Sequence, residues 1–342
     1  MRYDFASDNV AGMAPEALQA LNDANAGLMR AYGGDEITAR AADAVRALLD
    51  ADAEVRFVFS GTAANAIACS MLAWPHEAVI AHHAAHVCTD ETGAPGFFGQ
   101  GVGLIGLPGF SGKIDPAALE AALAEPEVGH RQPPAALSVT QATEYGAVYD
   151  EEELSALIAP ARTRGLGVHM DGARLANAVA SGFDPTAIAR LGVDVLVLGG
   201  AKAGALCTEA LVMFDRSLAR RIDNRLKQAG QMASKSRFLA APLLGLLESG
   251  AWVRHGVHAN AMAARLGEGI ASSTPYALAH PPEANAVFVR MPAEAQAALS
   301  ARGWACYRFD DGSVRFVCSW ATTPEAVDAL VADIAALARV HG

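Results

Sequence analysis

Seven short apolar runs, separated by stretches of helical periodicity, most limit what this chain can fold into. The runs are EVRFVFSG (54–61), EAVIA (77–81), GVGLIGL (101–107), AALSVT (135–140), LGVHMD (166–171), VDVLVLGG (193–200) and EALVMF (209–214). Runs of this length and apolarity are typical of strands that are covered on both faces of a sheet. The helical stretches between them are TAANAIACSMLAW (62–74), DPAALEAALAE (115–125), DEEELSALIAPARTRG (150–165) and TAIARLG (186–192). This alternation predicts an α/β fold with a mostly parallel, seven-stranded sheet sandwiched by helices.

The pattern changes at about residue 250. A long helical stretch (248–272) leads into the run NAVFVRM (285–291), a further helix, and the segment WACYRFDDGSVRFVCSW (304–320). Asp311-Gly312 separates two alternating runs there, which is a hairpin signal. Because 342 residues exceed one average domain, we expect a large domain over 13–248 and a small C-terminal α+β domain over 249–342.

Composition and charge exclude several classes of protein. The net charge is −11 and no basic stripe is present, which argues against a nucleic-acid surface. No apolar run has the roughly 18 residues of a membrane span, and the segment MRYDFASDNVAGM lacks the apolar stretch of a signal peptide. The five cysteines are scattered and form no C-x-x-C, which suits free thiols in a reducing compartment. We therefore expect a soluble, cytoplasmic protein.

Three motifs resemble known ligand-binding patterns, but each lacks part of what its binding site requires. GVGLIG (101–106) matches the dinucleotide pattern, but Pro108 follows at once, so no helix opens there. GFSGKI (109–114) lacks the spacing and the Ser/Thr of a phosphate-binding P-loop. His82, His83 and His86 are spaced as zinc ligands, but no cysteine or second carboxylate pair completes a site. We expect no metal; one of these histidines could instead offer an aromatic surface.

Three other positions gather at one edge of the expected sheet. Lys202 follows the run that ends in two glycines, and the alternative is that its side chain simply points into water. Asp171 ends another run, and the alternative is that it only caps the helix that follows. Ser60-Gly61-Thr62 stands where a strand gives way to a helix, and there a phosphate seat and a plain Thr N-cap both fit. Ligands of open parallel sheets bind outside the carboxyl ends of the strands. A lysine, an acid and a phosphate seat together are what pyridoxal phosphate requires.

With these motifs the chain resembles the threonine aldolase family of pyridoxal-phosphate enzymes, which have the aspartate-aminotransferase type of fold (fold type I). The matching segments, in the order of the family and over nearly the full length, are YDFASDNVAG, MRAYGGDEIT, SGTAANAIA, AHVCTDETGAP, HMDGARLANA, GGAKAGA and VRFVCSW. HMDGARL is the most specific of them, whereas SGTAAN is shared with related lyases.

The resemblance implies a role for each matched residue. Lys202 would bind pyridoxal 5'-phosphate as a Schiff base, Asp171 would keep its pyridine nitrogen protonated, and His86 would stack on its ring. Further cofactor contacts would come from Ser60, Gly61, Thr62 and Arg174, and from Lys235 or Arg237 across a subunit interface.

The substrate contacts implied by the resemblance come from distant segments. Ser7 of the N-terminal segment (1–12), Arg174 and Arg315 would bind the substrate carboxylate, and Tyr32 would complete the site from a neighbouring subunit of a homodimer or homotetramer. Thr143 stands where many family members have a histidine near the substrate β-hydroxyl, and threonine is no base near neutral pH. That leaves His86, Glu91 or a bound water to take the proton, or a preferred substrate other than threonine.

The expected reaction is retro-aldol cleavage of L-threonine, L-allo-threonine or a related β-hydroxy-α-amino acid such as phenylserine to glycine and an aldehyde. A β-eliminating lyase or an aminotransferase for another amino acid is the alternative within the same cofactor class. A non-catalytic protein that keeps the fold is the alternative from another class, and the presence of Lys202, Asp171 and Arg315 disfavours it.

Overall fold

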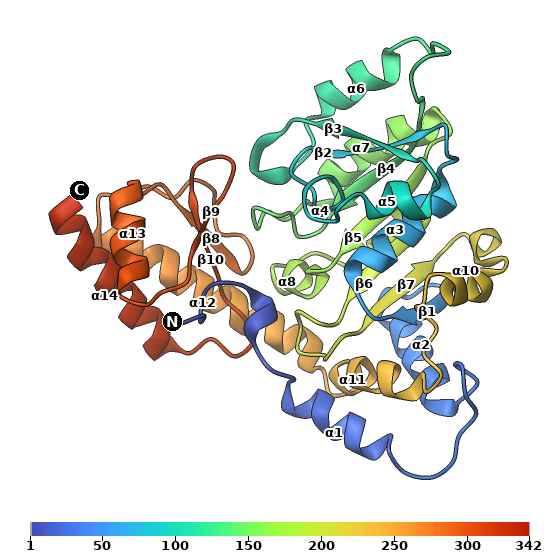
Figure 1. Ribbon diagram of the computed structural model, residues 1–342, viewed down its shortest axis with the longest axis horizontal. Helices are drawn as coiled ribbons and strands as arrows, with labels where there is room; N and C mark the ends of the chain where they lie inside the picture. The colour runs from blue at the N-terminus through green and yellow to red at the C-terminus, as the bar shows by residue number, and fades with distance from the viewer. Residues whose placement is uncertain (1, 342) are drawn as a thin grey trace.

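A seven-stranded sheet forms the centre of the larger part of the molecule in the computed structural model, which describes residues 2–341 (Figure 1). In spatial order its strands are β1 (Glu54–Val58), β7 (Glu209–Met213), β6 (Val195–Gly199), β5 (Gly167–Gly172), β4 (Pro134–Thr140), β2 (Ala78–His82) and β3 (Gly103–Leu107). Strand β7 pairs antiparallel with both of its neighbours, β1 and β6, and all other neighbouring pairs of the sheet are parallel. All seven predicted runs are strands, and the predicted fold class is confirmed.

Helices cover both faces of this sheet, as a parallel sheet requires. On one face lie α3 (Gly61–Leu72) and α10 (Ile222–Gln228), and on the other lie α2 (Glu36–Leu49), α7 (Glu151–Thr163) and α11 (Arg237–Glu248). The other helices and short 3₁₀ turns of this part are η1 (Asp8–Val10), α1 (Pro15–Asp23), α4 (His86–Thr89), α5 (Ala94–Phe98), η2 (Phe110–Gly112), α6 (Pro116–Ala124), α8 (Leu175–Ala180), α9 (Ala187–Leu191) and η3 (Arg216–Ala219).

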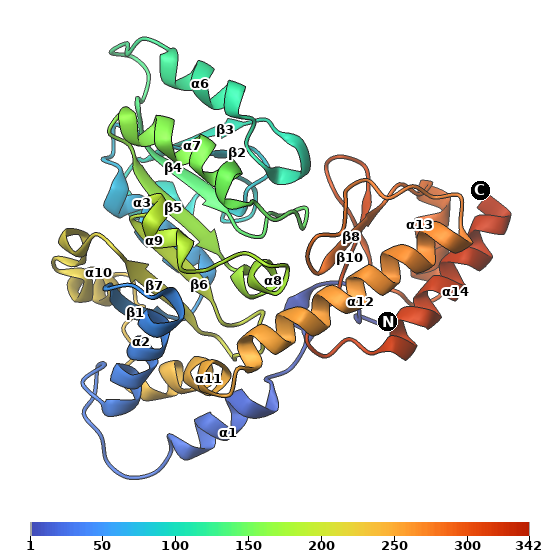
Figure 2. The ribbon, with the colours of Figure 1, turned by 180° about the vertical axis from the view of Figure 1, so that it is seen from behind.

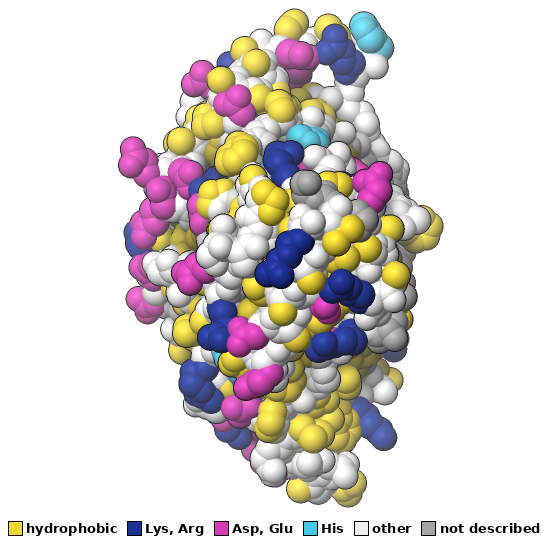
Figure 3. All heavy atoms as spheres, turned by 90° about the vertical axis from the view of Figure 1, so that its left-hand side faces the viewer, with side chains coloured by type: hydrophobic (Ala, Val, Ile, Leu, Met, Phe, Trp, Pro, Cys, Tyr) yellow, Lys and Arg dark blue, Asp and Glu magenta, His cyan; other side chains and the backbone are white. Residues whose placement is uncertain are grey.

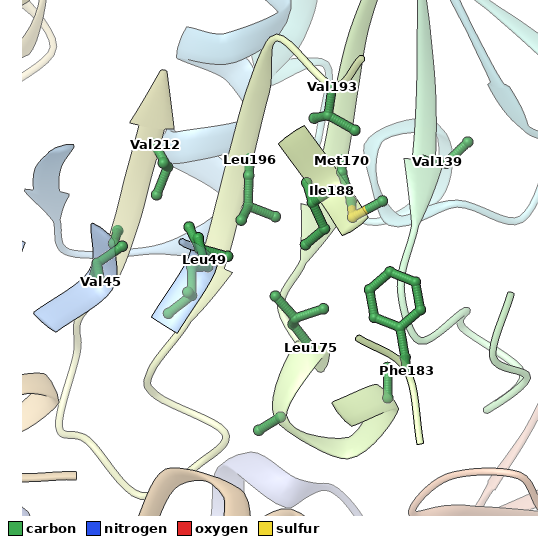
Figure 4. Packing of buried hydrophobic residues seen from close by; sticks show 14 of the residues in the cluster. Val45, Leu49, Val139, Met170, Leu175, Phe183, Ile188, Val193, Leu196 and Val212 are labelled. Carbon is green, nitrogen blue, oxygen red and sulfur yellow. The ribbon is translucent and has the colours of Figure 1, made fainter. Parts of the chain in front are cut away.

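Alternating side chains of the strands supply both halves of the core. In β6, Leu196 packs with α2 on one face, whereas Val195 and Val197 pack with α3 on the other. Figure 4 shows the first of these faces, where Leu196 lies among side chains from β5, β7, α2 and α9. The core thus determines which residues of each strand face each helical layer. The residues at the carboxyl ends of the parallel strands are left to form the cleft described below.

The smaller part has its own sheet and its own core. Its antiparallel strands, in the order β8 (Ala286–Val289), β10 (Val314–Val317) and β9 (Tyr307–Arg308), pack with α12 (Ala251–Ser273), α13 (Ala293–Ala301) and α14 (Pro324–His341). The predicted hairpin is present, with Gly312 at a φ of +80° in the loop between β9 and β10. Phe5 packs in this core, so the N-terminal segment runs along the smaller part.

Helix α12 joins the two parts, because it packs on α8 of the larger part and on α14 of the smaller (Figure 2). We propose that the domain boundary lies at 248/249, in the short connection between α11 and α12. None of the helices in residues 2–341 combines the length and the apolar character needed to cross a bilayer. On the face formed by the smaller part, basic and acidic side chains are intermixed (Figure 3).

Candidate active site

A cleft of about 620 Å³ lies between the carboxyl edge of the large sheet and the smaller part. Five of the residues singled out in the sequence line it, and they come from five separate stretches of chain. They are Ser7, His86, Arg174, Lys202 and Arg315. The fold therefore brings together in space the residues that the motifs placed far apart.

Lys202 lines this cleft at the edge of the sheet, and Asp171 lies buried beside it. Lys202 lies in the turn after β6, half-buried, and its ammonium forms no hydrogen bond or ion pair within residues 2–341. Asp171, on the adjacent strand β5, is only 3% exposed. Burial alone would raise the pKa of Asp171, but the positive charge of Lys202 lowers it below its ordinary value. The structure thus keeps a carboxylate ionised in the interior, facing a lysine.

A chain of hydrogen bonds links Asp171 to His86. Asn65 of α3 donates from Nδ2 to Asp171 and to Glu91, at 2.8 Å in each case. Glu91 in turn accepts from Nδ1 of His86 at 2.9 Å, and this bond raises the pKa of His86 against the opposing effect of burial. Glu91 is 3% exposed and lies behind His86, so His86 is the member of this pair that reaches the cleft.

The two arginines of the cleft differ in their partners. Arg174 makes a bidentate ion pair with the buried Asp8, at 2.7 and 3.0 Å, and its Nη1 lies 3.7 Å from Glu144. Burial opposes ionisation of Asp8, but the Arg174 guanidinium holds its pKa far below the ordinary value. Asn285 donates a further hydrogen bond of 3.0 Å to Asp8. The charge of Arg174 is therefore already balanced within the protein.

Arg315 has no such partner. Its Nη2 makes one long hydrogen bond, 3.5 Å, to the carbonyl of Ala6, and its buried Nε has no acceptor within the described chain. Burial, and then the nearby charge of Arg174, lower the pKa of Arg315. A half-buried guanidinium with unused donors beside a cleft is suited to bind a planar anion such as a carboxylate.

The start of α3 has the geometry of an anion seat. Ser60 is its N-cap and accepts from the N–H of Ala63 at 3.3 Å, so the plain Thr N-cap is excluded. Gly61 and Thr62 are the first residues of this 12-residue helix, where backbone N–H groups have no acceptor within the helix. A Cβ at Gly61 would meet nothing within 4 Å, so the seat is open.

Tyr32, Lys235 and Arg237 lie together but outside the cleft. The N–H of Tyr32 donates to Ser234, and Arg237 donates from Nη2 to Gly27, so two loops pair there. Tyr32 is 53% exposed, and Lys235 is also exposed. A single chain does not bring these residues to Lys202.

Thr143 is also outside the cleft. It is 1% exposed, donates from Oγ1 to the carbonyl of Ser111 and accepts from the N–H of Ala147. Its hydroxyl therefore holds a turn, and the adjacent Glu144 lines the cleft instead. The sequence reading did not single out Glu144, Asp8 or Asn65, although Asp8 and Asn65 stand inside the quoted motifs SDN and SGTAAN.

The histidine cluster is part of the framework. His82 pairs through Nε2 with the carbonyl of Gly109, and His83 through Nδ1 with that of Leu107, at 3.1 Å each. Within residues 2–341 no group of three or more His, Cys, Asp or Glu side chains is placed to hold a metal ion. These two histidines secure the loop that follows β3.

Comparisons with known proteins add to this geometry. A family model described as beta-eliminating lyase matches residues 4–294. The chain is 48% identical, over 97% of both chains, to a low specificity L-threonine aldolase of a Pseudomonas species. It is 46% identical, over 96% of both, to the protein of that name from Pseudomonas aeruginosa.

Solved structures agree on the fold. The threonine aldolase of Leishmania major superposes with a TM-score of 0.90 at 32% identity, over 100% of both chains. The serine palmitoyltransferase of Sphingomonas wittichii superposes with a TM-score of 0.72 at 14% identity, over 99% of this chain and 87% of the other. At that identity the second match shows the fold alone.

Proposed function

This chain belongs to the beta-eliminating lyase family and, within it, to the threonine aldolases, and we propose that it is a pyridoxal-phosphate-dependent carbon–carbon lyase. Its proposed reaction is the cleavage of L-threonine, L-allo-threonine and related L-β-hydroxy-α-amino acids such as phenylserine to glycine and an aldehyde. The observation that carries the proposal is the facing pair Lys202 and Asp171, with the unpaired Arg315 across the same cleft.

The residues present fit pyridoxal phosphate. An amine free of ion pairs, an ionised buried carboxylate and a helix start with free N–H groups match its aldehyde, its pyridine nitrogen and its phosphate. When bound, the cofactor supplies an electron sink for the pair released when the substrate Cα–Cβ bond breaks. Lys202 would bind it through Nζ, Asp171 would hold a proton on its ring nitrogen, and Gly61 and Thr62 would bind its phosphate.

Arg315 binds the substrate carboxylate, because it is the guanidinium whose donors are unused. Arg174, whose charge is balanced by Asp8, and Ser7 line the same cleft. Fixing the carboxylate would hold the substrate in one orientation, with the Cα–Cβ bond aligned for cleavage, which is a contribution of positioning.

His86 lines the cleft and would contact the cofactor and accept the proton of the β-hydroxyl. Its Nδ1 is bonded to Glu91, which leaves Nε2 to exchange a proton. Because the Glu91 bond raises the pKa of His86, the imidazole is a stronger base than an ordinary histidine. Activity is then lost as the pH falls through that raised pKa and the imidazole becomes protonated.

The active assembly is a homodimer or homotetramer with its sites at subunit interfaces. Support comes from Tyr32, Lys235 and Arg237, which group on the surface away from the cleft of their own chain. In the assembly they complete the cleft of a neighbouring subunit, with Lys235 or Arg237 on the cofactor phosphate. The five cysteines, all free, support a cytoplasmic location.

Product analysis after incubation of the holoenzyme with L-threonine tests this function. Equal amounts of glycine and acetaldehyde, absent with a Lys202→Ala variant, are the expected result. Release of 2-oxobutanoate would assign β-elimination instead, and turnover only with an added keto acid would assign transamination.

A further inference from the structure

Glu209 is a buried acid that the proposed reaction leaves without a role. It opens β7, which runs antiparallel to β6, so it lies beside Gly199 at the carboxyl edge of the sheet. Residues alternate along a strand, and Glu209 therefore shares the sheet face of Leu211 and Met213, which is the face covered by α3. Its side chain is 6% exposed, and burying a carboxyl group costs free energy unless the group is hydrogen-bonded or paired with a charge.

The carboxylate of Glu209 holds the chain that leads to Lys202. Its Oε2 accepts from the N–H of Gly200 at 2.9 Å, and the nearby N–H of Ala201 also favours its ionised form. A Cβ at Gly200 would lie 2.5 Å from the carbonyl of Thr208, so this connection is closely packed. On its other side, Trp252 donates from Nε1 to the carbonyl of Gly199 at 2.9 Å.

Three ionisable groups face Glu209 from the surrounding elements. Lys202, in the turn it supports, favours its ionised form; Asp171 of β5 disfavours it; and the Cys207 thiol precedes it in the chain. Burial is the largest effect, and together these raise the pKa of Glu209 to about 7. Its charge therefore changes near neutral pH, beside the lysine.

We propose that Glu209 is a positioning residue for Lys202, which it serves by fixing the Gly200 peptide and by stabilising positive charge at the lysine nitrogen. This inference rests on the proposed attachment of the cofactor to Lys202. A negative charge on Glu209 stabilises the protonated form of the nitrogen that joins the lysine to the cofactor. Loss of that charge must then shift the pH range over which this nitrogen is protonated.

The test is a pH titration of the visible absorbance of the holoenzyme with Glu209→Gln, which keeps an acceptor for Gly200 and removes the charge. We expect the titration midpoint to fall by roughly one pH unit. Glu209→Asp keeps the charge, so its titration midpoint is expected to stay close to that of the parent. Glu54→Gln is the matched control, because Glu54 lies on the adjacent strand β1 at the opposite end of β7.

A second readout is the pH dependence of the apoprotein's stability. A folded-state pKa of about 7, above the ordinary value of 4.5, means that the free energy of unfolding falls as the pH rises between these values. Glu209→Gln is expected to remove that fall.

An unchanged midpoint in Glu209→Gln, with Lys202 still labelled by borohydride reduction of the holoenzyme, would overturn the inference and leave the proposed function intact. A label on another lysine would overturn both. A midpoint that moves equally in Glu54→Gln would also overturn the inference, since the effect would not be local.

Discussion

The polar side chains on the two sides of the cleft differ in how fully they are paired with one another. The cleft floor, made of Lys202, Asp171, Asn65, Glu91 and His86, comes from the large sheet and its helices, and hydrogen bonds connect four of its five members in one chain. The cleft wall consists of Ser7, Asp8, Arg174 and Arg315.

The wall is assembled from distant segments and leaves one cation without a partner. Arg174 and Asp8, separated by 166 residues, neutralise each other, whereas Arg315 from β10 keeps unused donors. A preformed, internally bonded floor suits a permanently bound group, because its geometry must not depend on the substrate. An unpaired guanidinium suits an anion that arrives and leaves.

The largest expected effect is on the floor, in Lys202→Ala. Without the amine that binds the cofactor, we expect more than roughly a thousandfold loss of turnover and loss of the visible absorbance band. Borohydride reduction of the parent holoenzyme followed by peptide mapping checks the assignment. A reduced cofactor on any other lysine would contradict it.

The next effect in size is also on the floor, in Asp171→Asn. A neutral amide cannot hold the proton on the ring nitrogen, so we expect kcat to fall by roughly 100- to 1000-fold with the cofactor still bound. Asp194→Asn is the control. Asp194 precedes β6, is buried, and accepts a hydrogen bond from the N–H of Val168 at the start of β5, the end of that strand away from Asp171. This control is expected to lower Tm and leave kcat unchanged. Equal kcat in Asp171→Asn and the parent would reduce Asp171 to a cap of the following turn.

Of the two arginines in the wall, we expect Arg315 to contribute to substrate binding and Arg174 to the stability of the fold. Losing a charged bidentate contact costs about 2–4 kcal/mol, so Arg315→Leu is expected to lower kcat/KM by roughly 30- to 1000-fold with the cofactor spectrum intact. Arg174→Leu leaves Asp8 buried and unpaired, and we expect it to destabilise the fold by about 3–5 kcal/mol. Kinetics of Arg315→Leu within twofold of the parent would remove the distinction between the two arginines.

The smallest effect expected is a shift of the pH profile in Glu91→Gln. Its hydrogen bond raises the pKa of His86, so weakening that bond lowers the pKa. Because the base must be unprotonated, the acidic limb of kcat/KM is expected to move to lower pH by roughly half to one unit. A limb that stays in place would show that His86 is not the proton acceptor.

Most of the floor could be predicted from the sequence, because it depends on local order. Asp171 and Lys202 each follow an apolar run, and strands that run parallel end at the same edge of the sheet. Asn65 lies one turn into the helix whose start was predicted, but only the packing of α3 on the sheet shows that its amide bridges Asp171 and Glu91.

The wall could be predicted only in part, because the pairing of its side chains depends on contacts between segments far apart in the sequence. Arg174 and Arg315 look alike in sequence, and the Asp8 pair that distinguishes them forms only in the fold. Thr143 and Glu144 differ by one position, and the turn closed by Ala147 decides which of them faces the cleft. The partners of Tyr32, Lys235 and Arg237 belong to the proposed assembly, so neither the sequence nor one chain contains them.

A crystal structure of the holoenzyme with bound glycine tests the division of labour between floor and wall most directly. We expect the glycine carboxylate within hydrogen-bond distance, roughly 2.7–3.2 Å, of the Arg315 guanidinium, with Arg174 still paired to Asp8 and the cofactor held next to Lys202 and Asp171. A carboxylate bound by Arg174 in place of Asp8, with Arg315 left unpaired, would contradict the account.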